Sequence, residues 1–169
     1  MNSLIPVRRS CARPIFRPLL PAVVSALWTW GASKWASMDS PFDVADRILA
    51  KGVPKITLVD MHAEATGEKR YLAYYLDGRV SAVFGTHTHV QTADEGILDN
   101  GTGYISDLGM TGPKRSVLGV KPELVIQKMR TKMPVRFDLA DGACQMGCVL
   151  FTIDEKTGKT TAIERLLIE

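Results

Sequence analysis

The segment KITLVDMHAEATGEKRYLAYYLDGRVSAVFGTH, residues 55–87, decides the fold. Its two ends, KITLVDMH and VSAVFGTH, are short apolar runs that close on a histidine, which is typical of buried strands with polar tips. Between them, the residues from Thr66 to Asp77 can form a helix that ends at Gly78. A strand, a helix of this length and a second strand predict a βαβ unit with parallel strands.

The segments on either side extend this pattern. SPFDVADRILAKG, residues 40–52, has a helix start at Ser40-Pro41 and a glycine at its end. Four more elements are predicted: a third strand at 101–107, a helix at 121–132, an alternating strand-like run at 134–142, and a hairpin at 144–169 that turns at 156–159. The predicted class is therefore α/β, with antiparallel strands at the carboxyl end.

Residues 1–38 differ in composition from residues 39–169. They hold five basic residues and no acidic one, so the net charge of +3 for the whole chain becomes −2 for the rest. This distribution leaves no basic face for nucleic acid. Four prolines exclude a continuous helix, and the apolar run Leu19–Trp30 is shorter than the roughly 20 residues that span a bilayer. The segment loosely imitates a signal or transit peptide.

The three cysteines do not predict a disulfide framework. Cys144 and Cys148 lie four residues apart in a predicted strand, which would separate their Cα atoms by roughly 13 Å. Unpaired cysteines favour a reducing compartment, and we expect the protein in the cytoplasm.

All three histidines of the chain fall in or just after the two predicted parallel strands. His62 ends the first, and His87 and His89 follow the second in GTHTHVQTAD. In extended chain His87 and His89 would point the same way, roughly 6.6 Å apart. Functional groups gather at the carboxyl ends of strands in open α/β sheets, so the sequence predicts a metal site there. Three nearby carboxylates could serve either as oxygen ligands or as hydrogen-bond partners that fix the tautomers of the rings: Asp60, Glu64 and Asp94.

Other interpretations of these residues remain open. A histidine at a strand end is often a hydrogen-bonded structural group, and a His-x-His pair also occurs by chance. The chain contains neither a Gly-x-Ser-x-Gly nucleophile motif nor a P-loop, so neither chemistry competes with a metal site.

Four segments together resemble the YmdB-type metallophosphoesterases of the calcineurin-like phosphoesterase superfamily: DMHAEATGEK, YLDGRVSAVFGTHTHVQTADEGIL, GTGYISDLGMTGP and MPVRFDLADG. The resemblance runs from about Asp39 to the carboxyl end. It implies the carboxyl-terminal portion of an α/β/β/α sandwich and a phosphodiesterase of the type that hydrolyses 2′,3′-cyclic nucleotides. The implied partner is a small phosphodiester substrate, and the fold is compatible with a homo-oligomer.

The resemblance also implies two divalent metal ions, which could be Fe, Mn or Zn. His62 and His87 are expected on one ion and His89 on the other. Such ions act as Lewis acids on a phosphate and make a water a better nucleophile.

The family's amino-terminal motifs are not found in this sequence. These are a metal-binding aspartate, a Gly-Glu-Asn motif and a Gly-Asn-His motif that carries the catalytic histidine, so no catalytic residue is identified. We hypothesise that residues 1 to about 35 are an out-of-frame translation. A chain without those motifs could also be a non-catalytic metal-binding or interaction remnant that needs a partner chain.

Overall fold

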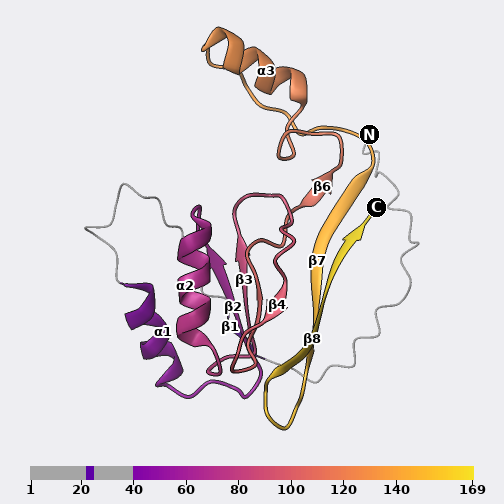
Figure 1. The fold of residues 1–169 in the computed structure, drawn as a ribbon. Coiled ribbons are helices and arrows are strands. Elements are labelled where there is room, and N and C mark those ends of the chain that lie inside the picture. Colours follow the sequence, from indigo (N-terminus) through magenta and orange to yellow (C-terminus); the bar gives the residue numbers. More distant parts are fainter. Residues whose placement is uncertain (1–21, 25–39) are drawn as a thin grey trace, which may run out of the picture.

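A computed structural model describes residues 22–24 and 40–169, and Figure 1 shows the arrangement of their helices and strands. Two sheets form the centre. The first has five strands in the order β1-β2-β3-β5-β4, and the second has three strands in the order β6-β7-β8. The bounds of the eleven elements in the described residues are β1 Ala22–Val24, α1 Pro41–Leu49, β2 Thr57–His62, α2 Thr66–Leu76, β3 Ala82–Thr86, β4 Gly96–Ile97, β5 Gly103–Ile105, β6 Thr111–Pro113, α3 Pro122–Thr131, β7 Cys144–Ile153 and β8 Thr160–Ile168.

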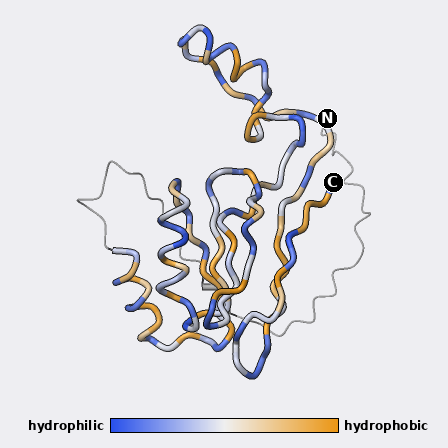
Figure 2. The backbone as a smooth tube through the Cα atoms, viewed as in Figure 1, coloured by the Kyte–Doolittle hydropathy of each residue, from blue (hydrophilic) through white to orange (hydrophobic). Residues whose placement is uncertain are grey.

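The predicted βαβ unit is confirmed. β2 and β3 pair in parallel, with Val59 opposite Val83 and His62 opposite Thr86, and α2 forms the crossover. The helix buries one face against the sheet, where Leu72 and Leu76 join Met61 in the hydrophobic core. Each such fully buried side chain stabilises the fold by about 1.5–3 kcal/mol. In Figure 2 the hydrophobic stretches run along the central strands.

The β7–β8 hairpin packs on the first sheet and is hydrogen-bonded to it. The Thr160 hydroxyl donates to the carbonyl of Ser81 over 2.6 Å. A Cβ atom on Gly103 would lie 2.8 Å from the ring of Phe151, so glycine is required where β5 meets the hairpin. The hairpin itself and its turn after Ile153 agree with the sequence-based prediction.

The α/β class with antiparallel strands at the end is confirmed, and both predicted outer helices form. Two details differ. The alternating run at 134–142 joins no strand and makes a single isolated bridge at Leu139, because no neighbouring strand lies beside it in the described part of the chain. The short strands β4 and β6, each of two or three residues, were not predicted.

Most of the compositionally distinct segment 1–38 lies outside the described residues, so its predicted origin is not addressed by the structure. The exception is β1, which pairs in parallel with β2 at the edge of the five-stranded sheet. Among the helices of the described residues, none combines the length and apolarity needed to cross a bilayer.

Candidate metal centre

His62 is held at the end of β2 by a chain of three side chains. The Thr86 hydroxyl donates to Oδ1 of Asp60 over 3.0 Å and lies 3.0 Å from Nδ1 of His62. An ionised carboxylate can only accept, so the Thr86 proton goes to Asp60 and its oxygen accepts from Nδ1–H of His62. Nε2 of His62 is then left with a free lone pair, the form in which imidazole binds metal ions.

His87 faces Nε2 of His62. Nδ1 of His87 lies 3.2 Å from Nε2 of His62, and the two ring centroids are 5.1 Å apart with the rings nearly perpendicular. Two nitrogens on one metal ion, each about 2.1 Å from it, would be separated by roughly this distance. The pair therefore fits two ligands of a single ion. A metal centre needs more ligands than these two.

The backbone turns sharply where the pair is formed. β3 ends at Thr86, and the next residues have φ values of 130° at His87 and 65° at His89. Positive φ is rare for residues with a Cβ, and such strain persists only where the surroundings impose it. The expectation that His87 and His89 share one face of an extended strand is therefore wrong: the chain bends between them.

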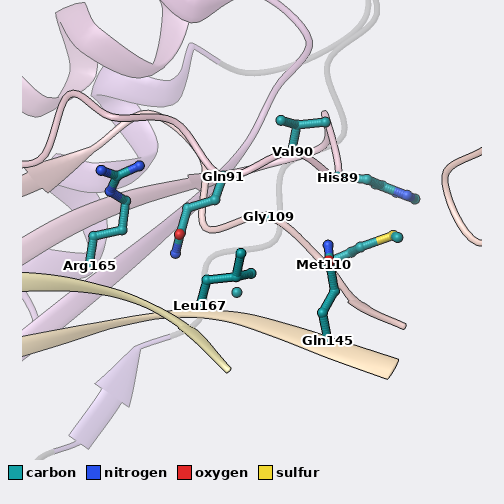
Figure 3. A pocket seen from close by; sticks show the side chains of 9 residues that line it. His89, Val90, Gln91, Gly109, Met110, Gln145, Arg165 and Leu167 are labelled. Carbon is teal, nitrogen blue, oxygen red and sulfur yellow. The ribbon is translucent and has the colours of Figure 1, made fainter. Parts of the chain in front are cut away.

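His89 instead lines a pocket of about 410 Å³ between this turn and the β7–β8 hairpin. Figure 3 shows His89 at one end of the pocket and Arg165 at the other, with Gln91 between them. The Gln91 amide donates to the carbonyls of Cys148 and Leu166, which ties the turn to both strands of the hairpin. The remaining lining residues are Val90, Gly109, Met110, Gln145, Gly147 and Leu167.

A buried ion pair is hydrogen-bonded to the turn, and it was not predicted from the sequence. Nζ of Lys69 lies 3.0 Å from Oδ2 of Asp107, and both side chains are 1% exposed. Both residues left a signal in the sequence. Asp107 follows a strand in the same way as His62 and His87, and Lys69 lies on the helix face of Leu72 and Leu76.

The other predicted neighbours behave differently from one another. Asp60 reaches His62 through Thr86, as described above. Asp94 does not contact the rings, because its carboxylate accepts from the backbone N–H and the hydroxyl of Ser106. Glu64 is exposed on the turn after β2, and within the described residues no hydrogen bond joins it to His62 or His87. In residues 22–24 and 40–169, no three His, Cys, Asp or Glu side chains form a metal-binding group.

The pKa values of two carboxylates around the turn are shifted in opposite directions. Burial raises the pKa of Asp60, and the hydrogen bond from Thr86 offsets only part of that effect. Burial acts in the same direction on Asp107, but the backbone N–H groups of Thr88 and Gly109 and the Lys69 ammonium outweigh it and lower the pKa of Asp107. Asp107 is consequently an anion at neutral pH.

Comparison with known proteins gives a consistent set of matches. A sequence profile described as YmdB-like protein matches residues 22–166, a range that begins before Asp39 and includes β1. A 2′,3′-cyclic-nucleotide 2′-phosphodiesterase of Bacillus subtilis is 49% identical over 133 residues, which cover 78% of this chain and 50% of that protein.

Two crystal structures resemble the fold. A hypothetical protein from Thermus thermophilus matches with a TM-score of 0.76 and 38% identity, over 86% of this chain and 56% of that one. A novel phosphatase from Mycoplasma pneumoniae matches with a TM-score of 0.76 and 34% identity, over 86% of this chain and 52% of that one. The chain thus spans about half the length of the relatives it matches.

Proposed function

Because this chain belongs to the YmdB-like family, we propose that it acts in metal-dependent phosphoester hydrolysis, of the type that opens 2′,3′-cyclic nucleotides. The observation that carries the proposal is the His62–His87 pair, whose facing nitrogens lie 3.2 Å apart at the carboxyl ends of β2 and β3. The name of the Bacillus subtilis relative supports the choice of substrate.

Each histidine has a distinct part in the proposal. His62 and His87 would be ligands of one divalent ion. His89, on the other side of the bend, would be a ligand of a second ion. Such ions supply Lewis acidity, which draws charge from a phosphate and lowers the pKa of a water. Fe, Mn and Zn all accept imidazole ligands. The chain's own contribution is to fix His62 in the required tautomer through Thr86 and Asp60.

The pocket beside His89 is the proposed place for the rest of the substrate. Its size lies in the range of small-ligand sites, and its lining combines apolar groups with amides. Gln145 and Leu167 suit a nucleobase, which needs both flat contact and hydrogen bonding. Arg165 contributes less charge than its position suggests, because its Nε lies 3.2 Å from Oε1 of Glu95.

A second candidate is a non-catalytic metal-binding or interaction part that requires a partner chain. It is favoured by one observation: within the described residues, only two imidazoles come together and no third ligand joins them. The two candidates differ in stoichiometry. Catalysis of the proposed kind requires two bound metal ions per chain, whereas the second candidate requires one weakly held ion and no turnover.

The test combines hydrolysis with metal binding. The purified chain is stripped with a chelator, loaded with Mn²⁺, Fe²⁺ or Zn²⁺, and assayed with 2′,3′-cyclic AMP while the bound metal is counted. Both His87→Ala and His89→Ala should abolish turnover and retain the far-ultraviolet circular dichroism of the parent. Glu64→Ala, an exposed change on the neighbouring turn, is the matched control. Turnover that survives both histidine changes would refute the proposed ligands. One metal ion without turnover would favour the second candidate.

We also propose a cytoplasmic location, which the cysteines support. Cys144 and Cys148 are free, and Cys144 is exposed. Free thiols persist in reducing compartments, which favours this proposal.

A further inference from the structure

We propose that Lys69 and Asp107 are positioning residues, which hold residues 87–92, the histidine loop, in the bent form that presents His87 to His62 and His89 to the pocket. This inference rests on the proposed function for its chemical purpose. Its geometric content, that the buried ion pair holds the loop, can be tested without any metal.

Asp107 binds the histidine loop at both ends. Its Oδ2 accepts from the backbone N–H of Thr88 over 2.9 Å, between the two histidines. Its main chain forms two hydrogen bonds with Thr92: the Asp107 N–H donates to the Thr92 hydroxyl over 2.9 Å, and the Thr92 N–H donates to the Asp107 carbonyl over 3.1 Å. His89 therefore lies in a segment whose two ends are fixed to one residue.

The same carboxylate also holds the segment that connects β5 to β6. Its Oδ1 accepts from the Gly109 N–H over 2.9 Å. A Cβ on Gly109 would come 2.9 Å from the backbone nitrogen of Gln91, so the loop and this connecting segment are already in close contact. With both oxygens occupied, Asp107 fixes the distance between the loop and the segment that leads into β6.

Lys69 makes this arrangement possible in the protein interior. A carboxylate that is 1% exposed would be costly without a compensating charge, and Nζ of Lys69 supplies it over 3.0 Å. The lysine comes from α2 and passes Gly85, where a Cβ would lie 2.6 Å from its Cδ atom. The helix that covers the sheet is thereby connected to the loop that carries the histidines.

The strained backbone of the histidine loop explains why hydrogen bonds to Asp107 are required. His87 and His89 both have positive φ, a conformation that residues other than glycine rarely hold unaided. The hydrogen bond from Thr88 to Asp107 lies between these two positions. Without it, we expect the loop to relax toward ordinary φ values and to separate the two rings.

Asp107→Asn is the first variant of the test. The Asn side chain has one acceptor oxygen and one NH₂ donor group in place of two acceptor oxygens. Its NH₂ group must therefore face another donor: either the Gly109 N–H, or the Thr88 N–H together with the Lys69 ammonium. We expect hydrogen exchange at Thr88 to rise about tenfold or more beyond any global effect, the ring-to-ring NOE between His62 and His87 to disappear, and Zn²⁺ affinity to fall by about 10- to 100-fold. Asp46→Asn, which makes the same change in an exposed pair with Arg79, should leave all three readouts near the parent values.

The double variant Lys69→Met/Asp107→Asn separates positioning from simple stability. Removing both charges of a buried pair relieves the unpaired cation, so the urea midpoint should recover relative to Asp107→Asn. If the pair positions the loop, exchange at Thr88 stays fast and Zn²⁺ affinity stays low despite this recovery. If loop order and affinity recover together with stability, or if Asp107→Asn leaves them within twofold of the parent, the positioning role is wrong. A parent chain that binds no Zn²⁺ would refute the proposed function, while the exchange and NOE measurements would still decide the positioning role.

Discussion

Gly85→Ala tests how tightly the sheet is closed beneath the histidines. Gly85 is the penultimate residue of β3, and a Cβ there would lie 1.8 Å from the carbonyl oxygen of Ser106 and 2.6 Å from Cδ of Lys69. The lysine stem can adjust, but the carbonyl belongs to the chain that runs on from β5. An ordinary carbon–oxygen contact requires a separation of more than about 3 Å, so the two chains must part by more than about 1 Å.

The expected cost follows from two effects. Overpacking of a closed interior costs about 1–3 kcal/mol, and the separation also weakens the hydrogen bond from the Leu108 N–H to the Gly85 carbonyl, worth about 1 kcal/mol. We expect Gly85→Ala to lower the free energy of unfolding by about 2–4 kcal/mol, a large part of the roughly 5–15 kcal/mol of a typical domain. Because His87 lies two residues further on, the His62–His87 contact should be lost as well.

Urea unfolding followed by far-ultraviolet circular dichroism measures the first effect, and the ring-to-ring NOE measures the second. Gly96→Ala is the matched control, since it makes the same change in β4 of the same sheet and a Cβ there meets nothing within 4 Å. The control should change stability by less than about 1 kcal/mol. A loss below about 1 kcal/mol at Gly85, or an equal loss at both positions, would show that the sheet is not closed in this way.

Two further predictions concern the carboxylates and their partners. Thr86→Val keeps the shape of the side chain and removes the hydroxyl between Asp60 and His62. We expect urea unfolding to show a loss of about 1–2 kcal/mol in stability, and calorimetric titration to show Zn²⁺ affinity reduced about tenfold. An unchanged NMR signal of the His62 Nδ1–H would contradict the assigned tautomer. Acid should loosen the histidine loop, because the pKa of the Asp107 carboxyl is lower in the folded chain than in the unfolded one. The ionised carboxylate therefore contributes its full stabilisation above the ordinary pKa of about 3.9. This stabilisation is lost as the pH falls through the lower pKa of the folded state. Urea midpoints between pH 7 and pH 3 should show this loss, the raised pKa of Asp60 acts in the opposite direction, and Asp107→Asn should have a shallower slope than the parent.

The sequence predicted the elements whose signals are local. Apolar runs that end in a polar residue located β2 and β3, and Ser40-Pro41 and Gly78 marked helix ends that the structure confirms to within a few residues. The alternating run at 134–142 has the period of a strand but lacks a partner strand among the described residues, and period alone cannot supply one.

The candidate site was predictable only as a neighbourhood. Parallel strands that end at the same edge bring His62 close to His87, and this part of the prediction needed no tertiary information. The bend at His87 and His89 depends on acceptors that come from Asp107, about 20 residues further along the chain, so extended geometry was the natural assumption and was wrong. Lys69 was overlooked because charged residues of an amphipathic helix usually face water.

His62 and His87 are held in position by different interactions, and these interactions determine which substitutions can displace each ring. His62 belongs to a strand with parallel neighbours, and its ring is oriented by Thr86, so displacing it requires disruption of the sheet. His87 lies beyond the last residue of β3, where no ladder continues and its φ is unfavourable. Its position therefore depends on the hydrogen bonds between Asp107 and the loop. A single substitution at Asp107 should consequently separate the pair while β2 and β3 stay intact, whereas displacing the His62 backbone requires breaking the pairing of β2 with its neighbours.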